Sequence, residues 1–202
     1  MKKFLSALLV VAGAASPLCA AAYKIDPDHS SINFTIAHLT ISKVHGRFDK
    51  FSGTVEYEPG KMDLWKTEAS IETASVNTSV EARDKHLRSP DFFNVEKFPA
   101  MTFKSTKVSG VKDMKGKLTG DFTLLGVTKP LVLDVEGYGP VKDPWGNERV
   151  GATAKGKINR KDFGMVWNKT LDTGGLMIGD EIDIVLEIEA VKEKPKEAPA
   201  QK

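Results

Sequence analysis

An alternation of apolar and polar residues with a period of two limits most strongly what this chain can fold into. Near the N-terminal end of the body, Ile32, Phe34 and Ile36 alternate with Asn33 and Thr35. Successive side chains of a strand point to opposite faces, so this period is typical of strands with one buried face. The pattern recurs along the chain and predicts about eight strands, at residues 32–38, 53–57, 65–71, 101–108, 118–124, 131–138, 150–158 and 182–190.

Turn-forming residues separate these runs. The expected turns are Pro59-Gly60, Ser109-Gly110, Gly139-Pro140 and residues 143–147. Many short strands joined by such turns, with no alternating long helices, favour an all-β fold, either a closed up-and-down barrel or a sandwich.

One stretch departs from the strand pattern. Thr78 and Glu81 have the spacing of a capping box in front of a helical run at residues 82–88. Ser89 followed by proline offers a second helix start, which would carry Phe92 and Phe93. We therefore expect a short helical excursion between strands.

The two ends differ from the body. Residues 1–21 have a basic start, a short apolar run and then small residues, which is the pattern of a cleaved secretory signal peptide. Residues 22–190 form one domain, and residues 191–202 form a charged tail that is expected to be disordered. Cys19 is the single cysteine, and Leu18 before it disfavours lipidation. The mature chain is therefore expected to fold without disulfides.

Charge and motif content exclude several classes of function. The 202 residues carry 29 basic and 27 acidic side chains, and the body has no one-signed excess, so nucleic acid is not an expected partner. The four histidines lie on separate segments without metal-ligand spacing, so we expect no metal. The chain has neither a Gly-x-Ser-x-Gly elbow nor a phosphate-binding glycine loop. No cofactor is expected.

An eight-stranded barrel is either filled by side chains or left open for one small ligand. Glycines within the strand runs remove inward bulk or mark bulges, and aromatic residues elsewhere supply apolar walls. These glycines are Gly53, Gly120, Gly137, Gly151 and Gly156. The residues alone leave open whether the barrel interior is a solid core or a cavity.

Seven motifs stand in order along the body: Tyr23-Lys24-Ile25-Asp26; His29-Ser30 with Ile32, Phe34, Ile36 and His38-Leu39; Val44, Gly46, Phe48, Phe51 and Gly53; Arg83-Asp84 with His86-Leu87-Arg88-Ser89 and Asp91-Phe92; Phe98-Pro99 with Met101, Phe103 and Ser105; Leu124 with Gly126-Val127-Thr128-Lys129-Pro130; and Asp143-Pro144-Trp145-Gly146. In this order and spacing they closely resemble the YceI-like family of bacterial periplasmic proteins, over residues 23–190.

The resemblance implies a lipocalin-like, eight-stranded antiparallel β-barrel whose apolar cavity holds a polyisoprenoid lipid or an isoprenoid quinone. It implies a periplasmic binding or carrier protein rather than an enzyme. It also suggests a link to stress and to a cytochrome b561-type membrane protein as partner. Whether the protein is a monomer or a homodimer stays open.

Face alternation and the position of the helical stretch predict the residues that contact the ligand. The expected lining is Phe34, Ile36, Phe103, Phe122, Leu124, Met165 and Trp167, with Phe92 and Phe93 near the mouth and His38 or His86 as contacts of the head group. Two alternatives remain. One is an enzyme that modifies such a lipid with His38 as general acid or base. The other is a solid-core stress protein that acts through surface contacts.

Overall fold

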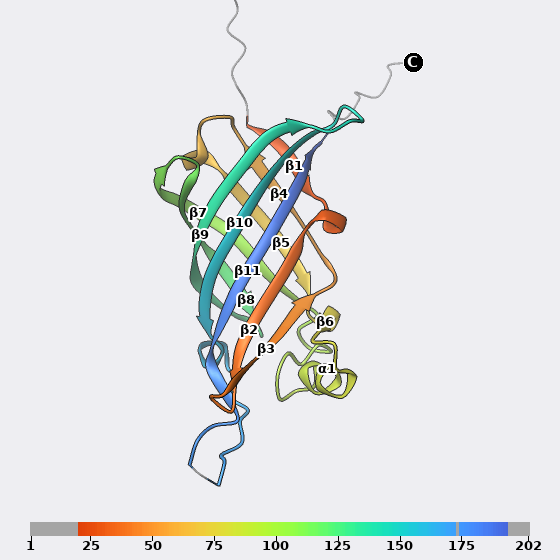
Figure 1. Ribbon diagram of the computed structural model, residues 1–202, viewed down its shortest axis with the longest axis vertical. Helices are drawn as coiled ribbons and strands as arrows, with labels where there is room; N and C mark the ends of the chain where they lie inside the picture. The colour runs from red at the N-terminus through yellow and green to blue at the C-terminus, as the bar shows by residue number, and fades with distance from the viewer. Residues whose placement is uncertain (1–19, 173, 194–202) are drawn as a thin grey trace, which may run out of the picture.

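The computed structural model describes residues 20–172 and 174–193 (Figure 1). Its strands are β1 Ala21–Ile25, β2 Ser31–His38, β3 Ser42–Phe48, β4 Phe51–Tyr57, β5 Lys66–Glu72, β6 Val76–Asn77, β7 Ala100–Lys112, β8 Lys115–Leu124, β9 Val127–Lys142, β10 Glu148–Asn159 and β11 Ile178–Lys192. The helix is α1, Glu81–Arg88, and the 3₁₀ turns are η1 Pro27–His29, η2 Met62–Leu64, η3 Thr73–Ser75 and η4 Arg160–Phe163.

The strands form one antiparallel sheet that closes on itself. Neighbours along the sheet run β1, β4, β5, β7, β8, β9, β10 and β11, and β11 pairs back to β1. β2 continues β1 along β11, β3 pairs with β2, and β6 pairs with β3. These three strands thus continue strands that already belong to the ring and do not add to the number of strands around it. The eight-stranded antiparallel barrel expected from the sequence is confirmed.

All eight expected strands are present, in β2, β4, β5 and β7 to β11. The sequence missed β1, β3 and β6. β3 has the alternation, but its inward positions include Gly46, where a Cβ would stand 2.3 Å from the ring of Phe34. The ring of Phe34 on the neighbouring strand fills the space beside Gly46. The inward face of β3 therefore lacks an apolar side chain at this position, and its alternation of apolar and polar residues is weak.

Two expected turns are wrong. Ser109-Gly110 lies inside β7, and Gly139-Pro140 lies inside β9. The β7–β8 and β9–β10 hairpins both continue past these residues. In each hairpin the pairing register of the strands shifts there, before the β7–β8 turn and beside Arg149 on β10. Bulges let a ladder continue past residues that would otherwise end a strand. The turn between β7 and β8 is made instead by Asp113 and Met114.

The helical excursion is confirmed as α1, but its start differs from the capping-box prediction. The cap position is Val80, and the Thr78 amide (2.9 Å) and hydroxyl (2.5 Å) both donate to Asp84 Oδ1. The helix is therefore fastened by a buried carboxylate within it. No second helix follows Ser89: Phe92 and Phe93 lie in turns after α1.

The sheet reaches slightly beyond residues 22–190 at each end. Ala21, assigned above to the leader, pairs with Tyr57 in β1 and β4. Val191 and Lys192, assigned above to the tail, pair with Lys24 and Tyr23 and complete β11. Residues 1–19 of the predicted leader and 194–202 of the predicted tail lie outside the described residues, and the domain limits stay a prediction. Over residues 20–172 and 174–193, no helix has the length and apolar character needed to cross a bilayer.

Glycines on inward positions make room for aromatic rings. A Cβ at Gly120 would stand 2.4 Å from the ring of Phe103, and one at Gly137 would stand 2.3 Å from the ring of Trp65. Gly151 differs, because its nearest neighbour, Ile188 O, would be 3.4 Å away. The expectation that strand glycines remove inward bulk therefore holds at Gly120 and Gly137, where the space is taken by a ring.

Gly137→Ala is expected to lower the free energy of unfolding by about 1–3 kcal/mol, because the added methyl overlaps the Trp65 ring in a packed region. Denaturant unfolding measures the change. Gly151→Ala, a strand glycine with ordinary space around its Cβ, is the matched control and should lose much less. Equal stability of the two variants would contradict the packing of Trp65 over Gly137.

Candidate ligand-binding site

A cavity of about 620 Å³ runs through the barrel. It lies within the range of about 300–1,000 Å³ typical of small-molecule sites. All eleven residues predicted as ligand contacts lie on its wall: Phe34, Ile36, His38, His86, Phe92, Phe93, Phe103, Phe122, Leu124, Met165 and Trp167. The structure thus brings these side chains together around one space, and their contact with a ligand stays a prediction.

The cavity is lined by strands from all around the barrel, but the burial of its wall differs from side to side. The inward side chains of β7, β8 and β9, such as Met101, Phe122 and Leu133, are buried. Those of β2 and β11, such as Phe34 and Ile184, are only half-buried although they also line the cavity. A packed core buries its inward residues uniformly. The interior therefore holds a cavity rather than a solid core, and we call the loosely packed wall along β2 and β11 the hollow side of the barrel.

An aromatic cluster closes one end of the cavity. The rings of Tyr23 and Tyr57 meet edge to face at 5.7 Å, and Tyr57 lies 5.1 Å from Trp65. The Tyr57 hydroxyl donates to the carbonyl of Gly139 at 3.3 Å, and the Tyr23 hydroxyl donates to Glu148. Burial, reinforced by the Glu148 carboxylate, raises the pKa of Tyr23, so this hydroxyl stays protonated and keeps its donor role.

The opposite end is bordered by α1. Arg83 donates to the Thr78 hydroxyl at 2.7 Å and to the Thr78 carbonyl at 2.9 Å, and its side chain reaches the cavity wall. Val80, just before α1, lines the cavity and is itself exposed. His38, at the end of β2, lines the same region and is half-buried. The cavity is open here, and its few polar groups, mainly donors, are concentrated at this mouth.

His86 connects α1 to the segment after η4. Its ring meets Phe92 at 5.0 Å and Trp167 at 4.9 Å, both edge to face, and its Nε2 lies 2.8 Å from Asp91 Oδ2. A histidine held in this way orients two aromatic walls of the mouth. The ring is also close enough to the opening to meet a polar group of a ligand.

Arg160 is a site residue that the sequence did not single out. It is fully buried in η4 and donates to the carbonyls of Met165, Trp167 and Gly179 and to Asp180. Burial lowers its pKa and Asp180 opposes that effect. Since a buried guanidinium is tolerated only with such partners, Arg160 holds the two predicted wall residues Met165 and Trp167 in place.

The sequence also missed Trp65 and the inward row of β11 as lining. That row, Ile182, Ile184 and Leu186, is visible in the alternation of residues 182–190, so a signal was present. Arg160 gave no such signal in the sequence, because an arginine after a strand is most often a surface residue. Its role depends on how the chain from Met165 to Gly179 folds back over it.

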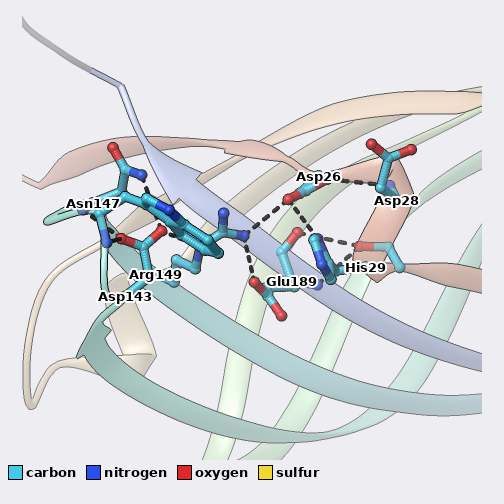
Figure 2. A network of polar contacts seen from close by, with 9 residues as sticks. Asp26, Asp28, His29, Asp143, Asn147, Arg149 and Glu189 are labelled. Atoms are coloured by element: carbon cyan, nitrogen blue, oxygen red, sulfur yellow. Dashed lines mark hydrogen bonds and ion pairs between the residues drawn. The ribbon is translucent and has the colours of Figure 1, made fainter.

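A polar network lies where the barrel closes, around Arg149 on β10 (Figure 2). Its guanidinium donates to Asp26 after β1 at 2.9 Å, to Asp143 in the β9–β10 turn at 2.9 Å and to Glu189 on β11 at 2.5 Å. His29 Nδ1 stands 2.9 Å from the same Asp26 carboxylate. One arginine thus joins three segments at the closure.

In the described part of the chain, Asp26, His29 and Glu189 are the one group whose ligand atoms lie near enough to share a metal ion. The Arg149 guanidinium already donates to both carboxylates of this group. A second cation would have to displace a charge that satisfies the same oxygens. The carboxylate oxygens of this group are therefore already engaged in an ion-pair network with Arg149.

The network shifts the titration of its members. Burial alone would raise the pKa of Asp143, but hydrogen bonds from Arg149, Asn147 and backbone amides outweigh it and hold the pKa at about 2. Hydrogen bonds from His29 and then Arg149 lower the pKa of Asp26, and the same contact raises the pKa of His29. Asp143 and Asp26 therefore stay ionised, and able to pair with Arg149, to lower pH than free aspartates.

A closed antiparallel barrel around an apolar cavity defines the lipocalin-like class of fold. Comparison with known proteins supplies the family. The family model described as the YceI-like domain matches residues 23–190, and the chain belongs to this family. It is similar to Protein YceI of Salmonella newport (strain SL254), with 42% identity over 192 residues, which cover 94% of this chain and 95% of the relative.

Solved structures share the fold. A YceI protein of Campylobacter jejuni is 37% identical, with a TM-score of 0.69 over 78% of this chain and 90% of that one. BcnA of Burkholderia cenocepacia is 20% identical, with a TM-score of 0.72 over 82% and 99%. A polyisoprenoid binding domain from Saccharophagus degradans is 18% identical, with a TM-score of 0.63 over 86% and 99%. The last two show likeness of fold alone.

The Arg149 network predicts a specific acid sensitivity. Because the pKa of Asp143 falls from 3.8 to about 2 on folding, its contribution to stability is complete above pH 3.8 and is lost as the pH falls through 2. Asp143→Asn should therefore lower the free energy of unfolding at neutral pH and flatten its dependence on pH between 3.8 and 2. Denaturant titrations across this range measure both effects.

The control is Asp121→Asn, which removes a carboxylate from an exposed position on β8. This variant should keep the wild-type pH profile. If Asp143→Asn retained the same steepness as the control, the ion pair with Arg149 would not contribute to folding.

Proposed function

We propose that this protein is a periplasmic carrier that sequesters one long isoprenoid lipid or isoprenoid quinone in the barrel cavity without converting it. The observation that carries the proposal is the cavity itself: an apolar space of about 620 Å³, sealed at one end and open among polar groups at the other. Such a space suits a molecule with a long hydrocarbon chain and one polar head.

The length of the apolar wall supports a chain-shaped ligand. On β11 alone the lining extends from Ile178 to Ala190, which corresponds to roughly 40 Å of strand before the tilt of the barrel is considered. Each buried methylene contributes about 0.8 kcal/mol, so about ten buried carbons contribute about 8 kcal/mol before the cost of ordering the chain. Affinity then comes from the hydrocarbon wall, and the head group adds selectivity.

The relatives also support the proposed class of ligand. The structural neighbour from Saccharophagus degradans is itself a polyisoprenoid binding domain, and the fold is shared. The predicted leader, together with the family, supports a periplasmic location. A role in stress, a cytochrome b561-type membrane partner, and the choice between monomer and homodimer stay predictions.

The orientation of the ligand follows from the two ends of the cavity. The aromatic cluster of Tyr23, Tyr57 and Trp65 is buried and presents ring surface, which suits the end of a hydrocarbon chain. His38 and His86 lie at the open end, where a head group keeps part of its contact with water. We place the tail at the aromatic end and the head between α1 and the end of β2.

Ile184→Asp should abolish co-purification of the lipid, because it puts a carboxylate against the hydrocarbon on the hollow side of the barrel. Val185→Asp is the matched control: it is the next residue of β11, faces away from the cavity, and should keep the lipid at wild-type stoichiometry. Native mass spectrometry of protein purified without detergent, followed by extraction and identification of the lipid, gives the readout.

A wild-type barrel that is empty and also refuses added isoprenoids would overturn the proposal. An enzyme would give a different result: the extracted lipid would be chemically altered relative to the same lipid in the membrane, and His38→Ala would abolish the change. We expect the bound and membrane lipids to be identical in mass, in wild type and in His38→Ala alike.

A further inference from the structure

The mouth of the cavity is surrounded by exposed apolar side chains. Ile41 in the β2–β3 turn is 83% exposed and Val166 after η4 is 66% exposed, and Val80 and Leu176 are also exposed. Scattered single apolar residues on a surface need no explanation, but a group at one end does. We call these four residues the apolar rim.

A hydrogen bond and a ring contact tie the segments of the rim together. The amide of Leu39 donates to the carbonyl of Met177 at 2.8 Å, which joins the β2–β3 turn to the segment before β11. His86 of α1 meets Trp167 ring to ring at 4.9 Å, which joins α1 to the segment after η4. Figure 1 shows these segments at the end of the barrel opposite β1.

The turn that displays Ile41 is strained. Leu39 and Thr40 have φ values of 52° and 62°, and the Ile41 amide donates to the His38 carbonyl at 3.2 Å, which is the geometry of a type I′ turn. Such turns normally use asparagine and glycine, and a positive φ is a genuine outlier for a β-branched residue. Strain of this kind is concentrated at functional sites. Here it holds an apolar side chain out of the protein.

The rim carries little charge. The β2–β3 turn, Leu39 to Ser42, contains no charged residue, whereas the loop between Val166 and Leu176 contains the exposed Lys169 and Asp172, one of each sign. Val80 and Met177 belong to the cavity wall as well, so the apolar surface continues from the interior of the barrel onto its rim. A partner that covers the rim therefore also covers the mouth and meets the ligand as it enters or leaves.

We propose that the apolar rim docks on the surface of a lipid bilayer, so that the ligand passes between membrane and cavity without crossing water. The inference rests on the proposed carrier function. A bilayer is the medium in which an isoprenoid dissolves, and inserted apolar side chains gain the hydrophobic free energy that water denies them. Since the proposed contact is made by apolar side chains rather than by ion pairs, the association should persist at high salt.

The test compares two pairs of exposed residues at opposite ends of the barrel. The rim variant is Ile41→Ser with Val166→Ser, and neither residue lines the cavity. The control is Val141→Ser with Trp145→Ser, which removes similarly exposed apolar side chains, 60% and 79%, near the β9–β10 turn. All four positions are exposed, so both variants should fold.

Flotation with vesicles of phosphatidylethanolamine and phosphatidylglycerol measures association, and transfer of dansyl-labelled geranylgeraniol between vesicles measures delivery. We expect the rim variant to lose at least about tenfold in vesicle association and in transfer rate, at low and high salt, while the control variant matches wild type. Equilibrium binding of the probe, added from ethanol without vesicles, should be the same in all three proteins.

The outcomes separate the two proposals. Failure of wild type to bind the probe without vesicles would overturn the carrier function. Binding of the probe together with vesicle association that the rim variant retains in full would overturn membrane docking alone. A wild-type protein that binds the probe but does not float with vesicles would also overturn docking on lipid, and would assign the rim to a protein partner.

Discussion

The pairing of β1 with β11 is the interaction on which the rest of this structure depends. It turns a sheet with two edges into a ring, in which the backbone groups of both outer strands find partners. Arg149 reinforces the same place by joining Asp26, Asp143 and Glu189 from three segments. Once the ring is closed, the inward face of every strand points at a common axis, and a water-excluded interior follows without disulfides or metal.

The space left inside the barrel depends on how large side chains are distributed around its axis. Large side chains on β7, β8 and β9 fill their side, and rings such as Trp65 lie over glycines on neighbouring strands. The inward rows of β2 and β11 are less buried, and the cavity remains between them and the other strands. A uniform core would be more stable, since each lost packing contact costs free energy. The uneven packing is thus the structural basis of binding.

The two ends of the barrel are built for different tasks. The aromatic end keeps its tyrosine hydroxyls engaged with Gly139 and Glu148, so it is rigid and closed. The other end is assembled from α1, the β2–β3 turn and the segment held by Arg160, and it combines donors with exposed apolar side chains. Under the proposed carrier function, the closed end would limit the length of the ligand chain, and the open end would govern head-group choice and exchange.

Much of this was accessible from residues alone. The period of two located eight strands, the helical stretch before Arg88 was correct, and the ordered motifs indicated the family, because each of these signals is local in the chain. The sequence could not show the hollow side of the barrel, the role of Arg160, the Arg149 network or the position of the apolar rim. These features arise where side chains from distant strands meet, and only the closed ladder determines which of them share a space and which leave it empty.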